Sequence, residues 1–597
     1  MDKIIILDMG GQYAHLLARR IRQLGVYSEI KASDTSVDDL KSVKGIILSG
    51  GPKSVYDKDA PTCDPGIFSL NIPILGLCYG HQLIAQHYKG TVQGGKVKEY
   101  GIAKVKVTVK DGLFHDLSDE EQVWMSHGDE VTELPDGFIA TAATESCQIA
   151  AMADKDRRVY GIQFHPEVTH TPHGTDILNN FITICDAKRD FSVKSYYKII
   201  ESDIKTHAKG KKVFLLVSGG VDSTTCYALL EKVLGPDNVH ALFIDNGMVR
   251  KGEADRVRDN IERAGYTHLY IEDASDDFLS ALKDVYEPEK KRKIIGEKFM
   301  EVQQRVEKRL GLNPNEWIIA QGTIYPDTIE TKGTKHADLI KTHHNRVPLV
   351  QEMIEKGLVI EPLAGLYKDE VRELAREIGV PDNIVNRHPF PGPGLGVRCL
   401  CSKGDETIDN QAGATERIKA LLPRNLSVKI LPIRSVGVQG DSRSYRHPAV
   451  LWGTFPGWDI LEDLSTKVTN AVRDVNRVLW LLEPTGDSHC VVKSGYLTKD
   501  RLDLLREADS IIIEEMKRWG IYHDIWQFPV VLVPLGKGDG ESIILRPVTS
   551  REAMTARFAH LGADFLSCVT KRIIALEGID CVMIDITNKP PGTIEWE

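Results

Sequence analysis

At 597 residues the chain is too long for a single hydrophobic core, and its length predicts three or four domains. Its composition is that of an ordinary globular protein, and a formal net charge of −10 argues against a general nucleic-acid binder, which carries a basic excess. The ten cysteines are scattered without a Cys-x-x-Cys pair, which argues against a zinc framework or a secreted disulfide scaffold. No apolar stretch is long enough to cross a membrane and no leader pattern is present, so we expect a cytoplasmic protein.

Short apolar strands alternate with amphipathic helices through the first two thirds of the chain, a pattern typical of parallel α/β sheets. The early strands are predicted at 4–8, 45–48, 72–77 and 159–164. A polar break with a linker helix follows at 188–211, and a second series of strands is predicted at 213–217, 241–245 and 317–320. We therefore expect two successive α/β domains.

The last third of the chain differs in pattern. Residues 387–396 are too rich in proline and glycine for a helix or a central strand, so they predict a domain boundary. Beyond it, a helix followed by a strand occurs at 464–479 and again at 566–582. We interpret this as two copies of one α+β module, although helix–strand units also resemble each other through composition alone.

A cysteine stands where an apolar strand meets a helix, in Gly76-Leu-Cys78-Tyr-Gly80. Glycines on both sides permit the tight turn that exposes a nucleophile, and the helix N-terminus favours the thiolate. The N–H of Tyr79 is then placed to stabilise an oxyanion, and a second donor is available from Ser49-Gly50-Gly51-Pro52 at the end of a neighbouring strand. Without these glycines, a buried structural cysteine would be the better reading.

The strand at 159–164 runs into His165-Pro166-Glu167. Residues i and i+2 of an extended chain face the same side, and the proline keeps His165 out of the helical region. Glu167 can therefore accept the imidazole N–H and orient His165 toward a thiol. A surface His-Pro-Glu with no catalytic role is the alternative.

The motifs D-M-G-G-Q, L-S-G-G-P, G-L-C-Y-G-H-Q and F-H-P-E occur in this order within residues 1–187. The segment resembles a class I glutamine amidotransferase domain, with a flavodoxin-like fold. The resemblance implies that Cys78 forms a glutamyl thioester and that His165 and Glu167 complete a triad. It further implies an oxyanion hole from Gly51 and Tyr79, and glutamine binding by Gln82, Ser126 and His127.

A second functional loop follows the strand at 213–217. Its residues open a helix, where unpaired N–H groups and the helix dipole attract anions; they are Ser218, Gly219, Gly220, Val221, Asp222 and Ser223. No lysine follows the glycines, so this is not a Walker A loop. A carboxylate such as Asp222 repels phosphates unless it caps the helix or a cation lies between them, and we therefore expect Mg²⁺ there.

The loop S-G-G-V-D-S resembles that of the ATP pyrophosphatase superfamily, whose domains have a doubly wound, adenine-nucleotide α-hydrolase-like fold. The resemblance implies that ATP is cleaved between its α and β phosphates to adenylate a carbonyl oxygen. The polar segment 330–346 is predicted to form a mobile lid over the phosphates. A zinc site made of His336, His343 and His344 is the alternative, with no familiar ligand spacing.

NAD synthetases and other amide-forming ligases also use such loops, so the loop alone does not identify the acceptor. The segments H-P-F-P-G-P-G, L-P-I-R-S-V-G-V-Q-G-D and K-P-P-G-T-I-E-W-E, at 388–394, 431–441 and 589–597, resemble the GMP synthetase family. The resemblance implies that ammonia attacks adenylated XMP. The residues implied to contact XMP are Arg292, Asp441, Gln527, Lys589 and Glu595.

The chain is thus predicted to be a multidomain α/β protein with glutamine, ATP and XMP as substrates. The predicted bounds are 1–187 for the amidotransferase, 188–211 for the linker, 212–398 for the pyrophosphatase, and 399–495 and 496–597 for tandem dimerisation-type α+β modules. Because the module occurs twice, either a monomer or a homodimer is expected. The alternatives are another glutamine-dependent adenylating ligase, such as NAD synthetase, and a catalytically silent nucleotide-binding regulator.

Overall fold

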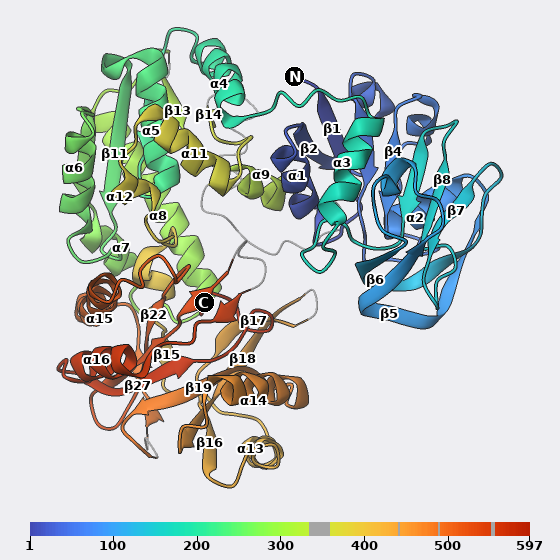
Figure 1. Cartoon of the computed structure of the whole chain (residues 1–597). Helices are drawn as coiled ribbons and strands as arrows, with labels where there is room; N and C mark the ends of the chain where they lie inside the picture. Colours follow the sequence, from blue (N-terminus) through green and yellow to red (C-terminus); the bar gives the residue numbers. More distant parts are fainter. Residues whose placement is uncertain (314, 333–358, 440–441, 487–489, 551–555) are drawn as a thin grey trace. The chain divides into compact units, whose positions relative to one another are not determined.

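The computed structural model describes residues 1–313, 315–332, 359–439, 442–486, 490–550 and 556–597 (Figure 1). The chain divides into two compact units. Unit 1 comprises Met1–Asp203, Ile324–Lys341 and Ala364–Leu374, and unit 2 comprises Ile204–Thr323, Thr342–Leu363 and Ala375–Glu597. Within the described part of the chain, none of the helices combines the length and the apolar character needed to span a bilayer.

Unit 1 is built on a nine-stranded sheet in the order β2-β1-β3-β4-β9-β8-β7-β5-β6. The strands from β2 to β9 run parallel, and the pairs beyond β9 are antiparallel. The strands are β1 Lys3–Asp8, β2 Tyr27–Ala32, β3 Gly45–Leu48, β4 Ile74–Leu77, β5 Thr91–Val107, β6 Glu120–Glu133, β7 Ile139–Ala143, β8 Ala151–Asp154 and β9 Val159–Ile162.

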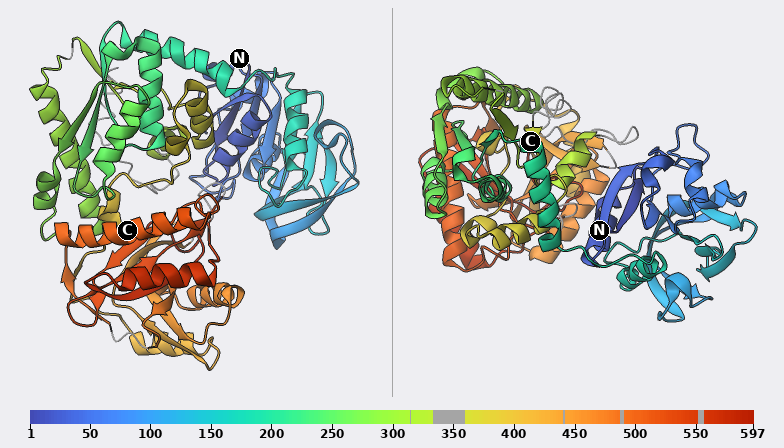
Figure 2. Two further views of the ribbon diagram at one scale, coloured as in Figure 1. Left: turned by 60° about the vertical axis from the view of Figure 1, so that its left-hand side comes forward. Right: turned by 90° about the horizontal axis from the view of Figure 1, so that it is seen from above.

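Helices cover both faces of the parallel part of this sheet (Figures 1 and 2). They are α1 Ala14–Gln23, α2 Tyr79–His87 and α3 Gly174–Ile184, and α4 Val193–Ala208 follows. Alternate residues of β1 pack into different cores: Ile4 and Ile6 lie in the cluster that contains α1 and α3, whereas Ile5 lies with α2. A strand buried on both faces must be apolar at every position, which explains the continuous apolar run of β1.

Helix α9 (Tyr325–Lys332) and the first part of α11 (Lys368–Ile378) also belong to unit 1. The buried guanidinium of Arg22, on α1, lies 2.8 Å from the carboxylate of Glu370 and donates to the carbonyl of Gly365 at 2.8 Å. It also lies 5.0 Å from the ring centroids of Tyr325 and Tyr367. A buried charge needs such partners, so these contacts hold the two segments against α1.

Unit 2 begins with a five-stranded parallel sheet in the order β12-β11-β10-β13-β14. Its strands are β10 Lys212–Leu216, β11 Val239–Asp245, β12 Leu269–Asp273, β13 Trp317–Ala320 and β14 Val359–Ile360. Its helices are α5 Val221–Leu234, α6 Glu253–Arg263, α7 Ser275–Ala281, α8 Pro288–Arg309 and α12 Asp382–Val385. The strand order reverses between β10 and β13, so the carboxyl end of β10 is the switch point where doubly wound sheets bind ligands.

The rest of unit 2 is built on one seven-stranded sheet, ordered β16-β18-β19-β27-β24-β22 with β17 paired to β18. Its strands are β16 Leu426–Ile430, β17 Ser435–Gln439, β18 Ser442–Gly453, β19 Val475–Glu483, β22 Val530–Val533, β24 Glu541–Leu545 and β27 Ile579–Asp585. Its helices are α13 Gln411–Lys419, α14 Trp458–Ala471, α15 Lys499–Arg518 and α16 Ala563–Ile574. Short two-residue strands form three separate pairs, β15-β21, β20-β23 and β25-β26: β15 Ser402–Lys403, β20 Val491–Val492, β21 Ser494–Gly495, β23 Leu535–Gly536, β25 Val548–Thr549 and β26 Arg557–Phe558.

This sheet contains the same connection twice. In the first half, β16 and β18 are antiparallel, β18 and β19 are parallel, and α14 connects β18 to β19. In the second half, β22 and β24 are antiparallel, β24 and β27 are parallel, and α16 lies in the connection from β24 to β27. The two halves meet where β19 pairs with β27 in antiparallel fashion. This topology favours the predicted tandem modules, and their common origin stays a proposal.

The predicted strands are confirmed, with ends that differ by one or two residues. The predicted helix–strand units correspond to α14–β19 and α16–β27. Residues 387–396 form a loop that leads into a 3₁₀ turn at Gly394–Val397. The antiparallel strands β5 to β8 were not predicted. From residue 333 onward the predicted lid, and with it His336, His343 and His344, lies outside the described residues.

Candidate active sites

Cys78 stands at the turn between β4 and α2 in a strained backbone conformation, with φ 49° and ψ −103°. The turn is too tight for side chains beside it, because a Cβ at Gly76 would come within 2.4 Å of the carbonyl oxygen of Gly80. The N–H of Cys78 donates to the carbonyl of Ile162 on β9 at 2.8 Å, which anchors the turn to the sheet. The predicted nucleophile elbow is therefore present.

The imidazole of His165 is buried beside this turn, and its Nδ1 lies 2.7 Å from Oε1 of the buried Glu167. Burial of the ring lowers the pKa of His165, but the charge of Glu167 and hydrogen bonds to Cys78 and Glu167 outweigh it and raise that pKa to about 10. The ring is thus held between a carboxylate and a thiol. A thiol, an imidazole and a carboxylate in this arrangement can perform acyl transfer through a thioester.

The glycines after β3 lie against this group. A Cβ at Gly50 would be 3.0 Å from Cε1 of His165 and 3.7 Å from Cβ of Cys78, so a side chain there would press on the imidazole. A Cβ at Gly51 would be 3.2 Å from Cγ of Tyr79, so the residues of the two predicted oxyanion donors are neighbours in space. Sequence reasoning named Gly50 only within the segment Ser49–Pro52, because only the fold shows which of the adjacent glycines touches the imidazole.

A main-chain carbonyl of β6 and a side-chain amide just after β9 contact the thiol. Cys78 Sγ donates to the carbonyl of Ser126 at 3.6 Å, and Gln163 Nε2 donates to Cys78 Sγ at 3.6 Å. Gln82 Nε2 in turn donates to the carbonyl of Asp129 at 2.7 Å and to Gln163 Oε1 at 3.3 Å. Sequence reasoning missed Gln163, although it lies only two residues before His165.

In unit 2 the predicted anion loop connects the carboxyl end of β10 to α5. The N–H of Ser218 donates to Ser223 Oγ at 3.0 Å, which closes the loop, and Gly219 has a φ of +70°. Helix α5 begins after Gly220 without a side-chain cap. Its first N–H groups and dipole are therefore directed at the switch point, as an anion site requires.

Other residues define the surroundings of this loop. Arg387 Nη1 donates to the carbonyl of Gly219 at 3.0 Å and pairs with Glu253 at 2.5 Å. Gly322 lies so close that its Cβ would come within 3.0 Å of the Cα of Ser223. Burial first, and then the charges of Glu361 and Asp222, raise the pKa of the Cys226 thiol in the first turns of α5. The carboxylates of Glu361 and Asp222 thus both act on the Cys226 thiol beside the loop.

The predicted XMP residues come together only in part. Gln527 Nε2 donates to Glu595 Oε1 at 3.2 Å and to the carbonyl of Pro389 at 3.2 Å. Arg292 donates to the carbonyl of Glu597. Lys589 pairs through its backbone with Ala556, at 2.7 and 3.2 Å, and Asp441 lies outside the described residues.

Residues 589–597 are held by packing. Trp596 is fully buried, and its Nε1 donates to Oδ2 of Asp585 at 3.0 Å. Arg477 lies 4.8 Å from the Trp596 ring centroid and pairs with Asp585 at 2.7 Å. The N–H of Val436, on β17, donates to the carbonyl of Trp596 at 2.9 Å. Residues 589–597 follow β27, the last strand of the sheet. They are therefore held in part by β17 and β19, which belong to its first half.

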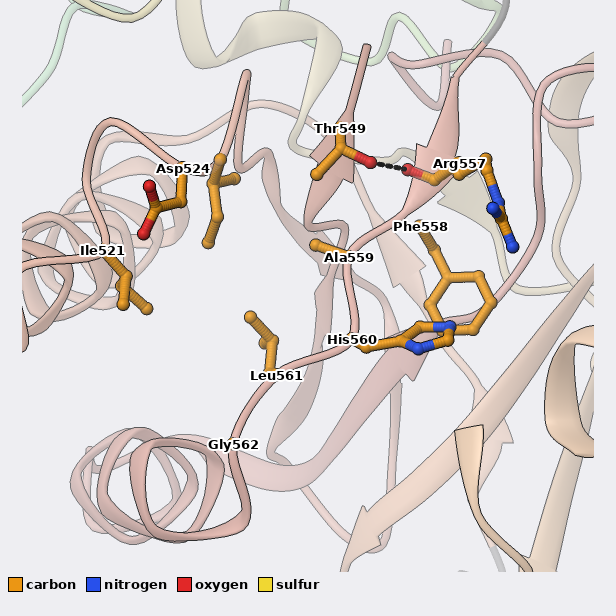
Figure 3. A pocket seen from close by; sticks show the side chains of 10 residues that line it. Ile521, Asp524, Thr549, Arg557, Phe558, Ala559, His560, Leu561 and Gly562 are labelled. Atoms are coloured by element: carbon orange, nitrogen blue, oxygen red, sulfur yellow. Dashed lines mark hydrogen bonds between the residues drawn. The ribbon is translucent and has the colours of Figure 1, made fainter. Parts of the chain in front are cut away.

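A pocket of about 380 Å³ lies elsewhere in unit 2 (Figure 3). Its lining mixes apolar and polar groups, and the Arg557 guanidinium is bound to Glu462 at 2.7 Å. The residues are Ile521, Asp524, Ile525, Thr549, Arg557, Phe558, Ala559, His560, Leu561 and Gly562. It contains no predicted site residue.

Comparisons with known proteins cover the regions that contain these residues. The family model described as glutamine amidotransferase class-I matches residues 5–185, the NAD synthase model matches 192–301, and the model described as GMP synthase C terminal domain matches 514–596. A probable glutamine-hydrolyzing GMP synthase of Leptospira interrogans is 44% identical over 609 residues, covering 100% of this chain and 99% of the relative. The glutamine-hydrolyzing GMP synthase of Syntrophomonas wolfei is 38% identical, covering 100% of this chain and 99% of the relative.

A shorter relative, the glutamine-hydrolyzing GMP synthase of Geobacillus kaustophilus, is 43% identical over 503 residues and covers 80% of this chain and 97% of its own length. About a fifth of this chain thus has no counterpart there. The longer relatives match from end to end, through both α/β regions and the C-terminal sheet. The chain therefore belongs to the family of glutamine-hydrolysing GMP synthases.

Proposed function

We propose that this protein converts XMP to GMP, with glutamine as the nitrogen source and ATP as the activating nucleotide. The observation that carries the proposal is the presence, in one chain, of the Cys78–His165–Glu167 group and the Ser218–Ser223 loop. Neither site alone accounts for the full-length match to glutamine-hydrolysing GMP synthases. Ammonia is a poor nucleophile toward a purine carbonyl until adenylation turns the oxygen into a leaving group.

In the first reaction, the Cys78 thiol gives its proton to His165 and its sulfur attacks the side-chain carbonyl of glutamine. The oxyanion that forms accepts hydrogen bonds from the N–H groups of Gly51 and Tyr79, two residues that are neighbours in space. His165, oriented by Glu167, donates a proton to the departing ammonia and then takes one from the water that hydrolyses the thioester. Gln82 and the Ser126–His127 segment are assigned to the substrate, since the carbonyl of Ser126 contacts Cys78 and Gln82 donates to the carbonyl of Asp129 at the end of the same segment.

In the second reaction, the 2-oxygen of XMP attacks the α-phosphorus of ATP and diphosphate leaves. Ammonia then attacks the purine carbon and AMP leaves with the oxygen, which gives GMP. The six residues from Ser218 to Ser223 hold the phosphates through the N-terminus of α5. Arg292, Asp441, Gln527, Lys589 and Glu595 are assigned to XMP, with Arg and Lys suited to its phosphate.

The residues beside the loop fit Mg²⁺. Asp222 and Glu361 supply carboxylate oxygens, and Ser218 and Ser223 supply hydroxyls, which are the ligands that Mg²⁺ prefers. When bound, Mg²⁺ would neutralise the charge of the phosphates. Asp222 is placed to hold it, and the positive end of α5 holds the phosphate oxygens.

The C-terminal part of unit 2 is proposed to consist of two tandem copies of one module, with bounds at 399–495 and 496–597. The two copies meet where β19 pairs with β27, and this pairing covers the strand edge that each copy would otherwise expose. We propose a monomer, or a homodimer through another surface. A cytoplasmic location agrees with ten cysteines that all remain free thiols.

A substrate panel tests the proposal. The purified protein, supplied with glutamine, ATP and Mg²⁺, should aminate XMP and leave nicotinate adenine dinucleotide unchanged, as followed by chromatography of the nucleotides. Amination of the second compound in place of XMP would indicate an NAD synthetase. The absence of any amination, with ATP binding retained, would indicate a silent regulator.

A further inference from the structure

Glu99 and His127 face each other across the long β5–β6 hairpin, as register partners in the two strands (Figure 1). His127 Nε2 lies 3.1 Å from Glu99 Oε2, and the side chains of His127 and Glu99 are 3% and 13% exposed. The other ring nitrogen, Nδ1, lies 3.0 Å from the carbonyl oxygen of Asp129. Both nitrogens of one buried imidazole therefore face oxygen acceptors.

A third polar group lies beside this pair. The thiol of Cys147 lies within 4.8 Å of both groups. Burial, together with the charges of Glu130 and Glu99, raises the pKa of Cys147 to about 12, so it remains a neutral thiol. Within this cluster, Glu99 is the group that contacts the His127 ring at hydrogen-bond distance.

The Glu99 carboxylate is itself held firmly. Its Oε1 accepts hydrogen bonds from Thr144 Oγ1 at 3.1 Å and from Ser146 Oγ, in the turn between β7 and β8. Because His127 contacts the other carboxylate oxygen, Glu99 links its own strand, β5, to β6 and to the turn between β7 and β8. A carboxylate fixed in this way can determine the position of the imidazole.

From His127 the contacts lead directly to the thiol. The Asp129 carbonyl accepts from His127 Nδ1 and from Gln82 Nε2 at 2.7 Å. Gln82 also reaches Gln163, which donates to Cys78 Sγ, and the carbonyl of Ser126 accepts from that sulfur. The segment 126–129 is thus placed by His127 at one point and touches the nucleophile at another.

We propose that Glu99 is a positioning residue for glutamine hydrolysis, which holds the Ser126–Asp129 segment in its substrate-binding position through His127. This inference rests on the proposed function of the Cys78 site. Glu99 does not touch the thiol, so its contribution is to the binding of glutamine and not to the chemical step. Its loss should therefore appear in KM.

The test compares Glu99→Ala, Glu99→Gln and, as a matched control, Glu133→Ala, in the full-length protein. Glu133 lies on the same strand pair, where its carboxylate accepts from Thr91 Oγ1 at the surface. The readouts are kcat and KM for glutamine hydrolysis, and synthesis from ammonium salts. Glu99→Ala should raise the KM for glutamine roughly tenfold, as expected for loss of a hydrogen bond to a charged group, with kcat changed less than about threefold.

Glu99→Gln should restore a KM near that of the wild type, because its amide N–H can donate to Nε2 of a neutral His127 while Nδ1 keeps its bond to Asp129. Synthesis from ammonium salts should be unchanged in all variants. The inference is overturned if Glu99→Ala behaves like Glu133→Ala, if Glu99→Gln is as impaired as Glu99→Ala, or if ammonia-driven synthesis falls in parallel. Failure of the wild type to hydrolyse glutamine would instead refute the proposed function.

Discussion

The buried guanidinium of Arg398 holds the carboxylate of Glu595 through two parallel hydrogen bonds, Nε to Oε2 at 3.0 Å and Nη2 to Oε1 at 2.8 Å. Arg398 is fully buried, whereas the side chain of Glu595 is 22% exposed. The carboxylate is therefore fixed on one side and open on the other, where Gln527 also reaches it. A group assigned to XMP thus depends on an arginine that sequence reasoning did not single out.

Replacement of Arg398 by lysine should weaken XMP binding. A lysine keeps the charge but cannot form the two-pronged contact, so Glu595 loses its fixed orientation. We expect the KM for XMP in the ammonia-driven reaction to rise roughly tenfold, with the KM for ATP changed much less. Arg424→Lys, at an exposed position, is the control. An unchanged KM for XMP would show that the orientation of Glu595 does not matter.

Replacement of Cys78 by alanine should abolish synthesis from glutamine and preserve synthesis from ammonium salts. The thiol is the proposed nucleophile of the first reaction only, and the Ser218–Ser223 loop belongs to the other compact unit. Both rates can be followed through GMP formation. Cys63→Ala, in the same unit, should retain both activities. If Cys78→Ala loses both activities while its circular dichroism is unchanged, the assignment of separate sites is wrong.

Replacement of Glu167 by glutamine should destabilise unit 1 in a pH-dependent way. Burial lowers the pKa of His165, but Glu167 more than offsets it, and the pKa rises from 6.5 to about 10 in the folded protein. A raised pKa contributes stability that is complete below about pH 6.5, declines above it and disappears near pH 10. The free energy of unfolding of Glu167→Gln, measured by chemical denaturation, should therefore lie on the order of 3 kcal/mol below that of the wild type at pH 6 and approach it at pH 10.

Glu167→Gln introduced into a His165→Asn variant isolates the contribution of the contact between Glu167 and His165. With no imidazole to charge, the effect of Glu167→Gln on the free energy of unfolding should lose its dependence on pH between about 6 and 10. A difference that persists at pH 10 in the single variant would mean that Glu167 acts through packing and not through the charge of His165.

The nucleotide products of the full reaction should be AMP and diphosphate, with a requirement for Mg²⁺. The loop at the N-terminus of α5 lacks a lysine after its glycines and carries Asp222 in the first turn. Asp222→Asn should raise the Mg²⁺ concentration needed for half-maximal rate, because one anionic ligand is lost. Asp237→Asn, at an exposed position, is the control. Detection of ADP and phosphate would contradict adenylation.

Replacement of Lys589 by alanine should raise the KM for XMP and leave basal glutamine hydrolysis unchanged. Loss of a charge-assisted contact to phosphate costs about 2 kcal/mol, or roughly thirtyfold in affinity. The backbone of Lys589 pairs with Ala556, so the substitution leaves these two backbone hydrogen bonds intact. Lys419→Ala, at an exposed position, serves as the comparison. A KM for XMP equal to that of the wild type would refute this assignment.

Local patterns in the sequence were enough for most of the parallel strands and for the turn at Cys78, but they did not predict β2, β12 and β14. A strand buried on both faces must be apolar throughout, and a strained turn must be flanked by glycine, so both leave direct marks on neighbouring residues. His165 and Glu167 are two residues apart, and their pairing follows from the geometry of an extended chain. The Ser218–Ser223 loop was recognisable because its residues are also contiguous and lie between a strand and a helix.

Contacts between distant residues were decided only by the tertiary structure. Arg398 and Glu595 are separated by 197 positions, and Glu99 and His127 by 28, with nothing near any of them to indicate the partner. The continuous sheet formed by β19 and β27 likewise depends on the pairing of two strand edges, which local composition does not encode. The sequence by itself therefore determined which groups carry the chemistry, because those groups impose local geometric demands. The fold decided which residues hold them in place, because burial and pairing are properties of the packed chain.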